Sequence, residues 1–165
     1  MKIIFIQTGG TIDKDYPKTK KGYAFEITEP AVERILRKVN PNFDYEIVHL
    51  LKKDSQDITH EDRDKISQIC QKIKDNRIII THGTETMIET ARRLSSIKSK
   101  TIILTGAMKP EKFTDSDASF NVGTAIGAIS LLSNGIYIAM NGRIYPWNKV
   151  KRNSRTGQFV ETEPQ

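Results

Sequence analysis

Short, continuous runs of apolar residues constrain this chain more than any other feature of its sequence. Three of them are Ile3–Ile6, Ile78–Ile80 and Ile102–Leu104. A strand with one exposed face would carry polar residues at alternate positions, and these runs carry none, so each predicts a strand that is buried on both faces. Such strands occur in parallel sheets that are covered by helices on either side. The sequence therefore predicts an α/β fold.

The segments between these strands show the spacing of apolar residues that is typical of helices. Helices are expected at residues 28–39, 59–75, 85–97 and 119–133, and further strands at residues 45–51 and 135–140. Thr59 and Thr84 stand where the second and third helices need an N-cap. The alternation of strands and helices predicts a three-layer α/β/α sandwich with a mainly parallel sheet, formed as one domain by residues 1–165.

Two regions fall outside this alternation. Residues 13–23 are polar and rich in lysine, and they contain Pro17 and Gly22, which predicts a long loop. Long loops of this kind often act as lids or binding loops. Residues 141–165 are polar with one tryptophan and one phenylalanine, and we expect an arm there rather than a further strand–helix unit.

Composition excludes several functional classes. The formal net charge is +6, but the basic residues are scattered and are not interleaved with aromatic residues, so nucleic acid is not expected as a partner. Cys70 is the only cysteine, which excludes an intrachain disulfide and a cysteine-based metal cluster. His49, His60 and His82 are dispersed and are expected to be structural. We expect neither a metal nor a cofactor.

Membrane insertion is not expected either. No apolar segment approaches the ~20 residues that cross a bilayer, and the apolar run after Met1 and Lys2 is too short for a signal peptide. The sequence is therefore expected to belong to a cytoplasmic protein.

Four predicted strands are followed by segments rich in glycine, hydroxyls or amides, namely Thr8–Thr11, Ser55–Asp57, Thr84–Glu85 and Gly106–Ala107. Ligands of open α/β sheets bind beyond the carboxyl ends of the strands, so these segments are expected to line one crevice. Neutral hydrogen-bonding groups suit a small amide or amino acid better than a phosphate or a metal. The spaced glycines of a dinucleotide fingerprint are absent. Taken alone, Thr81–Met87 is more simply explained as an ordinary strand-to-helix turn.

Taken together, these segments resemble the amino-terminal domain of the bacterial-type L-asparaginase family. The matching motifs, in family order and spacing, are Thr8–Ile12, Ser55–Asp57, Thr81–Met87, Gly106–Pro110, Ser116–Asp117, Phe120–Asn121 and Lys151–Asn153. Each motif is weak by itself, whereas the whole set in order is specific, and it covers nearly all of the 165 residues.

The resemblance implies hydrolysis of a side-chain amide, in L-asparagine or a related small molecule, to an acid and ammonia. Thr11 matches the nucleophilic threonine of the family, and Tyr23 matches the tyrosine that helps to activate it. Thr84, Glu85 and Lys151 match a second group, in which a threonine, an acid and a lysine form a proton relay.

The same resemblance assigns the substrate-binding residues. Ser55 and Gln56 match residues that hold the α-carboxylate and amino ends of the substrate. Backbone N–H groups near Gly10, Gly83 and Thr84 would stabilise the tetrahedral oxyanion, and loss of one such donor costs on the order of 3 kcal/mol.

Two departures from the family pattern bear on substrate and assembly. Glu85 stands where the family usually has aspartate, and because this acid also contacts the ammonium of the substrate, substrate choice could change. The family also has a second domain, which completes the site of a neighbouring subunit. Here another copy of the chain supplies that wall, or the site stays open, or the ligand differs. Tyr16 is an alternative to Tyr23 in the lysine-rich loop.

Two other functions stay open on the sequence. One is a binding module for a small ligand that is weakly active or inactive, and the other is an ammonia-releasing subunit of a tRNA-dependent amidotransferase. For any of them a homo-oligomer is expected, a dimer or larger. The small residues of the helix at 119–133 are the expected packing surface, with Trp147 and Phe159 reaching across to the partner.

Overall fold

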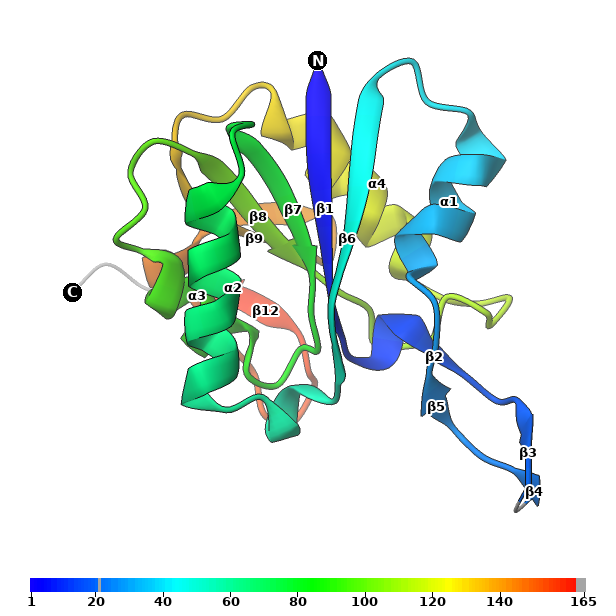
Figure 1. The fold of residues 1–165 in the computed structure, drawn as a ribbon. Helices are drawn as coiled ribbons and strands as arrows, with labels where there is room; N and C mark the ends of the chain where they lie inside the picture. The colour runs from blue at the N-terminus through cyan, green and yellow to red at the C-terminus, as the bar shows by residue number, and fades with distance from the viewer. Residues whose placement is uncertain (21, 163–165) are drawn as a thin grey trace.

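The computed structural model of the chain describes residues 1–20 and 22–162. At its centre is a six-stranded sheet with the order β10–β9–β8–β7–β1–β6 (Figure 1). The pairs from β9 to β6 are parallel, and β10 pairs antiparallel with β9. The strands are β1 (Lys2–Gly9), β6 (Asp44–Lys53), β7 (Arg77–Thr81), β8 (Thr101–Thr105), β9 (Gly135–Met140) and β10 (Arg143–Pro146). The prediction of a mainly parallel sheet is confirmed.

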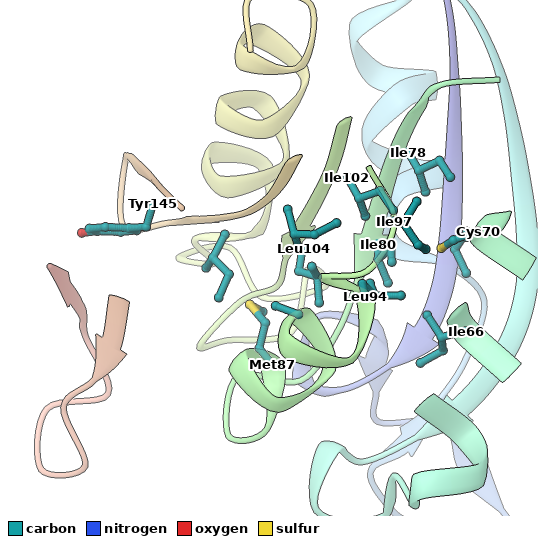
Figure 2. Close-up of a cluster of buried hydrophobic side chains, with 14 of the residues drawn as sticks. Ile66, Cys70, Ile78, Ile80, Met87, Leu94, Ile97, Ile102, Leu104 and Tyr145 are labelled. Carbon is teal, nitrogen blue, oxygen red and sulfur yellow. The ribbon is translucent and has the colours of Figure 1, made fainter. Parts of the chain in front are cut away.

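Helices cover both faces of the sheet, as predicted. Along β1, Ile3 and Phe5 pack with α1 (Ala31–Val39) and α4 (Ala118–Ile129), while Ile4 and Ile6 pack with α2 (His60–Lys72) and α3 (Met87–Leu94). Figure 2 shows part of the core on the α2 and α3 side, in which Ile78, Ile80, Ile102 and Leu104 meet residues of these two helices. The alternation of consecutive apolar residues between two cores explains why the runs carry no polar positions.

The helix starts test the capping predictions. Thr59 caps α2, because its hydroxyl accepts from the Asp62 N–H at 3.2 Å and the Asp62 carboxylate accepts from the Thr59 N–H at 3.0 Å. The expected cap at Thr84 is wrong, since α3 starts at Met87 with Thr86 in the N-cap position. Residues 82–85 instead form a loop that packs against other loops at the sheet edge.

The first helix also begins later than expected, at Ala31 instead of Thr28. The Thr28 backbone is committed elsewhere, because its N–H donates to the Asp13 carbonyl at 2.9 Å and its carbonyl accepts from the Gln7 amide at 2.9 Å. These bonds hold Thr28 against the loop after β1, so the helix can begin only after Pro30.

The lysine-rich segment expected to be a loop is a projecting hairpin (Figure 1). Its strands are short and antiparallel: β2 (Lys14–Asp15) pairs with β5 (Glu26–Ile27), and β3 (Lys18–Thr19) pairs with β4 (Gly22–Tyr23). Lys21 lies outside the described residues. We call residues 14–27 the hairpin from here on.

The expectation of an arm at residues 141–165 is corrected for the described part, which ends at residue 162. Its first strand is β10 of the main sheet, and β11 (Val150–Arg152) and β12 (Phe159–Glu161) form an antiparallel ribbon. Phe159 is 2% exposed and lies in the same core as α3, and Trp147, in η3 (Trp147–Lys149), packs partly buried against it. Phe159 is therefore not free to reach a partner, because the core of the chain itself holds it, whereas Trp147 keeps part of its surface exposed.

The order of the parallel strands locates the expected site. After β1 the chain passes to β6 on one side and then crosses back to β7 on the other, so the direction of winding reverses between β1 and β7. Crevices at such a reversal are where open α/β sheets bind ligands. The segments that leave this point are the loops containing Gly10 and Gly83. Within the described ranges, no helix combines the length and the apolar character needed to cross a membrane.

Candidate active site

Three loops meet at the reversal point through backbone contacts that only glycine permits. A Cβ on Gly10 would lie 2.4 Å from the Gly83 Cα, and a Cβ on Gly83 would lie 2.6 Å from the Ser55 Cβ. Gly10 also has φ +85° and donates its N–H to the Lys53 carbonyl at 2.9 Å. The loops after β1, β6 and β7 are thus stacked on one another, and the structure brings together the expected Gly10, Ser55 and Gly83.

Ser55 and Glu85 form the polar centre of this junction. Ser55 begins the short turn η2 (Ser55–Asp57), is fully buried, and donates its hydroxyl to Glu85 Oε2 at 2.9 Å. Thr86 donates its hydroxyl to the Ser55 carbonyl at 2.7 Å, which fixes the two loops to each other. Thr84 is buried beside them, whereas the Gln56 side chain is exposed.

His82 supports the Gly83 loop from below. Its Nδ1 lies 2.7 Å from the Gly83 carbonyl, which can only accept, so Nδ1 carries the proton and Nε2 accepts from the Thr90 hydroxyl at 2.8 Å. Complete burial lowers the pKa of His82 to about 4, against a weaker raising effect of the Gly83 contact. The ring is therefore neutral and serves to position Gly83, in keeping with the structural role expected from sequence.

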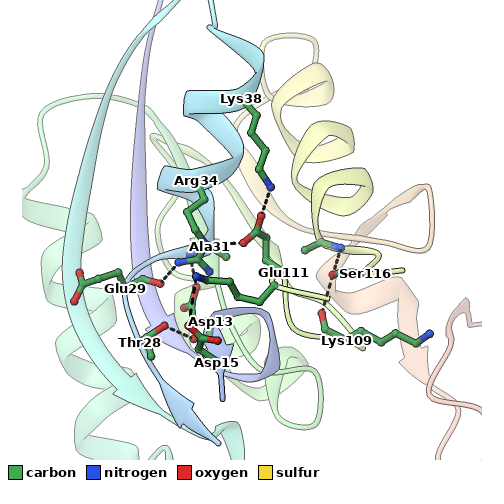
Figure 3. A network of polar contacts seen from close by, with 12 residues as sticks. Asp13, Asp15, Thr28, Glu29, Ala31, Arg34, Lys38, Lys109, Glu111 and Ser116 are labelled. Carbon is green, nitrogen blue, oxygen red and sulfur yellow. Dashed lines mark hydrogen bonds and ion pairs between the residues drawn. The ribbon is translucent and has the colours of Figure 1, made fainter. Parts of the chain in front are cut away.

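Thr11 opens the turn η1 (Thr11–Asp13) directly after Gly10 and is half-buried. Its hydroxyl has no hydrogen-bond partner within residues 1–20 and 22–162, so it is free to meet a ligand. Two residues further on, Asp13 is fully buried and accepts from the Ala31 N–H at 2.7 Å (Figure 3). It also accepts from the Gln7 amide at 3.2 Å. Pro30 provides no side-chain cap for α1, so the Asp13 carboxylate accepts a hydrogen bond from the first backbone N–H of the helix instead.

Asp13 is a residue that the sequence reasoning missed. Burial raises its pKa to about 7, although the bonds from Ala31 and Gln7 oppose the shift. A proton-binding carboxyl thus lies immediately beneath the Thr11 turn. A polar residue in a polar, lysine-rich segment gave no signal of burial, since only the docking of α1 removes it from water.

Glu111 anchors the same turn from the other side. Its N–H donates to the Ile12 carbonyl at 3.1 Å, and its carboxylate accepts from Arg34 Nε at 2.6 Å and Lys38 Nζ at 2.7 Å (Figure 3). Burial acts against the charged form, but the bonds from Lys38 and Arg34 outweigh it and lower the pKa of Glu111. The loop after β8, the turn η1 and helix α1 are therefore held together.

The loop after β8 completes the edge. A Cβ on Gly106 would lie 2.3 Å from the His82 carbonyl, so this glycine too is required by close approach. Asp117 accepts from the Met108 N–H at 2.9 Å and from the Asn121 amide at 2.8 Å, which ties the loop to α4. This loop supports the site through backbone packing.

Tyr23 does not join the site in this structure. It lies on β4, is 64% exposed, and stacks on Tyr16 with ring centroids 5.7 Å apart. The hairpin that carries both rings extends away from the sheet edge (Figure 1). An open depression of about 650 Å³ separates Phe25 and Ile27 of the hairpin from Lys52 and Lys53.

Lys151 also lies apart from the residues that the resemblance grouped with it. It is exposed on β11, opposite Val160, and within the described part of the chain it makes no side-chain bond to Thr84 or Glu85. The cation next to Glu85 is Arg152, whose Nη2 lies 3.7 Å from Glu85 Oε1. Lys151 is therefore not the buried lysine that a proton relay would need. Among the described residues, no cluster of three or more His, Cys, Asp or Glu could hold a metal ion.

The fold defines an α/β protein whose candidate site lies at the reversal of a mainly parallel sheet. Residues 2–159 match the family model described as "Asparaginase, N-terminal", and the chain belongs to that family.

Individual relatives agree with this assignment. The chain is 31% identical over 159 residues to the L-asparaginase of Thermococcus kodakarensis, covering 92% of this chain and 48% of the relative. It is 26% identical over 172 residues to a glutaminase-asparaginase of Acinetobacter glutaminasificans, covering 96% and 52%. A shorter match, 42% identity over 69 residues, links 41% of the chain to 16% of a protein from Methanococcus vannielii that is one of the subunits of its glutamyl-tRNA(Gln) amidotransferase.

Solved structures show the same fold. The thermostable L-asparaginase from Thermococcus kodakarensis superposes with a TM-score of 0.83 at 29% identity, over 98% of this chain and 51% of that one. L-asparaginase I from Vibrio cholerae gives a TM-score of 0.83 at 22% identity, over 97% and 51%, which shows the fold alone. The chain spans about half the length of the L-asparaginases and the glutaminase-asparaginase named here.

Proposed function

We propose that this chain is an asparaginase-like amidohydrolase that hydrolyses a side-chain amide, of L-asparagine or a related small amino acid, to the acid and ammonia. The observation that carries the proposal is the contact of Gly10 with Gly83. This contact sets the unpartnered hydroxyl-bearing residue Thr11 against the loop that contains Thr84 and Glu85.

In the proposed reaction the Thr11 Oγ attacks the amide carbon, which forms an oxygen–carbon bond and moves one electron pair onto the amide oxygen. Backbone N–H groups near Gly83 and Thr84 are proposed to stabilise that oxyanion, whereas the Gly10 N–H is already donated to the Lys53 carbonyl. The C–N bond then breaks and ammonia leaves with the proton taken from Thr11. Water hydrolyses the resulting ester and restores the threonine.

Glu85 and Ser55 are proposed to hold the amino-acid end of the substrate. The Glu85 carboxylate already accepts from Ser55 and retains 37% of its side-chain surface, so one face is available to an ammonium group. The Glu85 side chain is thus fixed by a hydrogen bond and still accessible to a ligand. This geometry supports a zwitterionic substrate over a simple amide.

A second candidate, a binding module that does not turn over its ligand, is favoured by one observation. The residues around Glu85 include Arg152 but not Lys151, and a guanidinium does not release its proton near neutral pH. A site that can hold an amino acid but lacks the base of the second relay would bind and react slowly.

Ammonia release from L-asparagine and L-glutamine, with and without tRNA, separates these functions. We expect release without tRNA, and loss of more than about 10³-fold in Thr11→Ala, since the nucleophile is removed. Thr11→Ser is the matched control, because it keeps a hydroxyl. Thermal unfolding of Thr11→Ala should match the parent within about 0.5 kcal/mol, as no core cavity opens.

Other outcomes would favour one of the other functions. L-Aspartate binding by calorimetry with no ammonia release from either amino acid would favour the binding module. Release that depends on tRNA would favour the amidotransferase function, and undiminished release by Thr11→Ala would remove Thr11 from the mechanism.

A further inference from the structure

The β11–β12 ribbon decides which basic residue faces the candidate site. Side chains of a strand alternate between its two faces. On β11, Val150 is buried in the core next to α3, Lys151 is exposed, and Arg152 is half-buried. Val150 and Arg152 thus share the inward face of the strand, and Lys151 lies on the outward face.

The register of this ribbon is fixed from both ends. Arg152 pairs with Phe159, which is buried. The Phe159 N–H donates to Asn141 Oδ1 at 3.0 Å, and the Phe159 carbonyl accepts from the Tyr145 hydroxyl at 2.9 Å. At the turn, the Asn153 N–H donates to the Gln158 carbonyl at 2.8 Å. A slip by one residue would expose Phe159 and exchange the faces of Lys151 and Arg152, so the core holds Arg152 inward.

Arg152 is partly buried and forms an ion pair with Glu85. Its side chain is 23% exposed, its Nη2 lies 3.7 Å from Glu85 Oε1, and its Nε is buried with no partner in the described part of the chain. The other Glu85 oxygen is occupied by the Ser55 hydroxyl. Glu85 is therefore oriented from two sides, by a hydroxyl of η2 and by a cation of the ribbon.

We propose that Arg152 is the positioning residue of this site and takes the place that the resemblance assigns to Lys151. It keeps Glu85 turned across the junction, in the orientation that receives the ammonium group of an amino-acid ligand. Because the guanidinium stays charged, it orients Glu85 without taking a proton in the reaction. This inference rests on the proposed function in one respect, the nature of the ligand.

The test is L-aspartate binding, measured by calorimetry, which requires no turnover. We expect Arg152→Met to weaken binding about tenfold, which corresponds to roughly 1.4 kcal/mol. Arg152→Lys should restore most of the affinity, since it returns the charge. In a Glu85→Gln background, Arg152→Met should add no further loss. Lys149→Met, a neighbouring exposed lysine in η3, is the matched control for removing one positive charge.

Lys151→Met is the competing variant. If it weakens binding about tenfold while Arg152→Met does not, the ribbon has the other register at the site and the inference is overturned. Equal losses in Arg152→Met and Lys149→Met would also overturn it, because only net charge would then matter.

Failure of the proposed function is distinguishable from failure of this inference. If the parent protein binds no aspartate, a double-mutant cycle of Glu85→Gln and Arg152→Met on thermal unfolding still tests the pair. Non-additive shifts in Tm would support the pairing of Arg152 with Glu85, and additive shifts would overturn it.

Discussion

The sheet edge and the hairpin are consecutive in sequence, yet they are held in opposite ways. At the edge, Gly9 and Gly10 lie so close to Lys53 and Gly83 that a single added carbon would overlap backbone atoms. In the hairpin, a Cβ on Gly22 would meet nothing within 4 Å. One half of the proposed site is therefore fixed by backbone packing, while the other half, with Tyr23, depends on where the hairpin lies.

The hairpin carries a row of exposed rings, and two ion pairs, Lys14 with Asp54 at 2.7 Å and Asp15 with Lys112 at 3.4 Å, join its base to neighbouring loops. Tyr16 stacks on Tyr23, and its ring centroid lies 5.0 Å from that of Phe25. The Phe25 centroid lies 6.4 Å from that of Phe113 in the β8–α4 loop. Contacts among exposed rings are weaker than the interlocked edge, because each ring remains largely in water. The difference indicates that the hairpin is held less tightly than the edge.

The largest effect on stability is expected for Gly10→Ala. Positive φ and overlap with the Gly83 backbone both oppose a side chain there, so the free energy of unfolding should fall by about 3–4 kcal/mol. Gly22→Ala is the matched control, since it also has positive φ, +102°, but open space, and should cost about 1–2 kcal/mol. Urea unfolding measures both. Equal losses would show that the edge is no more tightly packed than the hairpin.

The second prediction concerns pH. The folded pKa of Asp13 is about 7, above the ordinary value of 3.8, so between these values the folded state binds more protons than the unfolded state. The free energy of unfolding should therefore fall as pH rises from about 4 to about 7, by up to about 4 kcal/mol.

The variant Asp13→Asn should remove that fall, because an amide does not ionise. Asp15→Asn, at the base of the hairpin, is the control and should leave the fall in place. Thermal unfolding across this pH range measures the effect, and an unchanged slope in Asp13→Asn would mean that Asp13 is solvated.

The third prediction separates the two tyrosines of the hairpin. If the hairpin closes over the edge during turnover, Tyr23→Phe should lower ammonia release by about tenfold while changing stability little, because the ring is 64% exposed. Tyr16→Phe is the matched variant and should retain activity. The opposite pattern would assign the role to Tyr16.

The fourth prediction asks which exposed apolar region joins copies of the chain. Gly123 and Gly127 of α4 face open space, between the exposed Phe120 and Leu131, so these two glycines do not pack on the sheet. We expect a dimer or larger by light scattering, and Gly127→Arg should reduce it to about 19 kDa with little change in stability.

The control for assembly lies in the hairpin. Phe25→Ser should leave the dimer intact if α4 forms the interface. Loss of the dimer in Phe25→Ser alone would assign the interface to the hairpin, and a monomeric but active parent would contradict the assembly altogether.

The sequence predicted the parts of this fold that depend on local pattern. Apolar runs gave the strands around Ile4 and Ile79, and the Thr59–Asp62 capping box marked the start of α2. The glycine and hydroxyl segments predicted that several loops meet, because the carboxyl ends of parallel strands must share one edge. Gly10, Ser55 and Gly83 meet there, as the strand order requires.

Tertiary packing decided the rest. Asp13 lies in a polar segment and is buried only because α1 docks over it, while Tyr23 follows a hairpin whose position no local pattern fixes. Lys151 and Arg152 are adjacent and both basic, so the sequence could not tell which one faces Glu85. The burial of Phe159 sets the ribbon register, and because side chains alternate along a strand, that one distant contact turns Arg152 toward the site and Lys151 toward water.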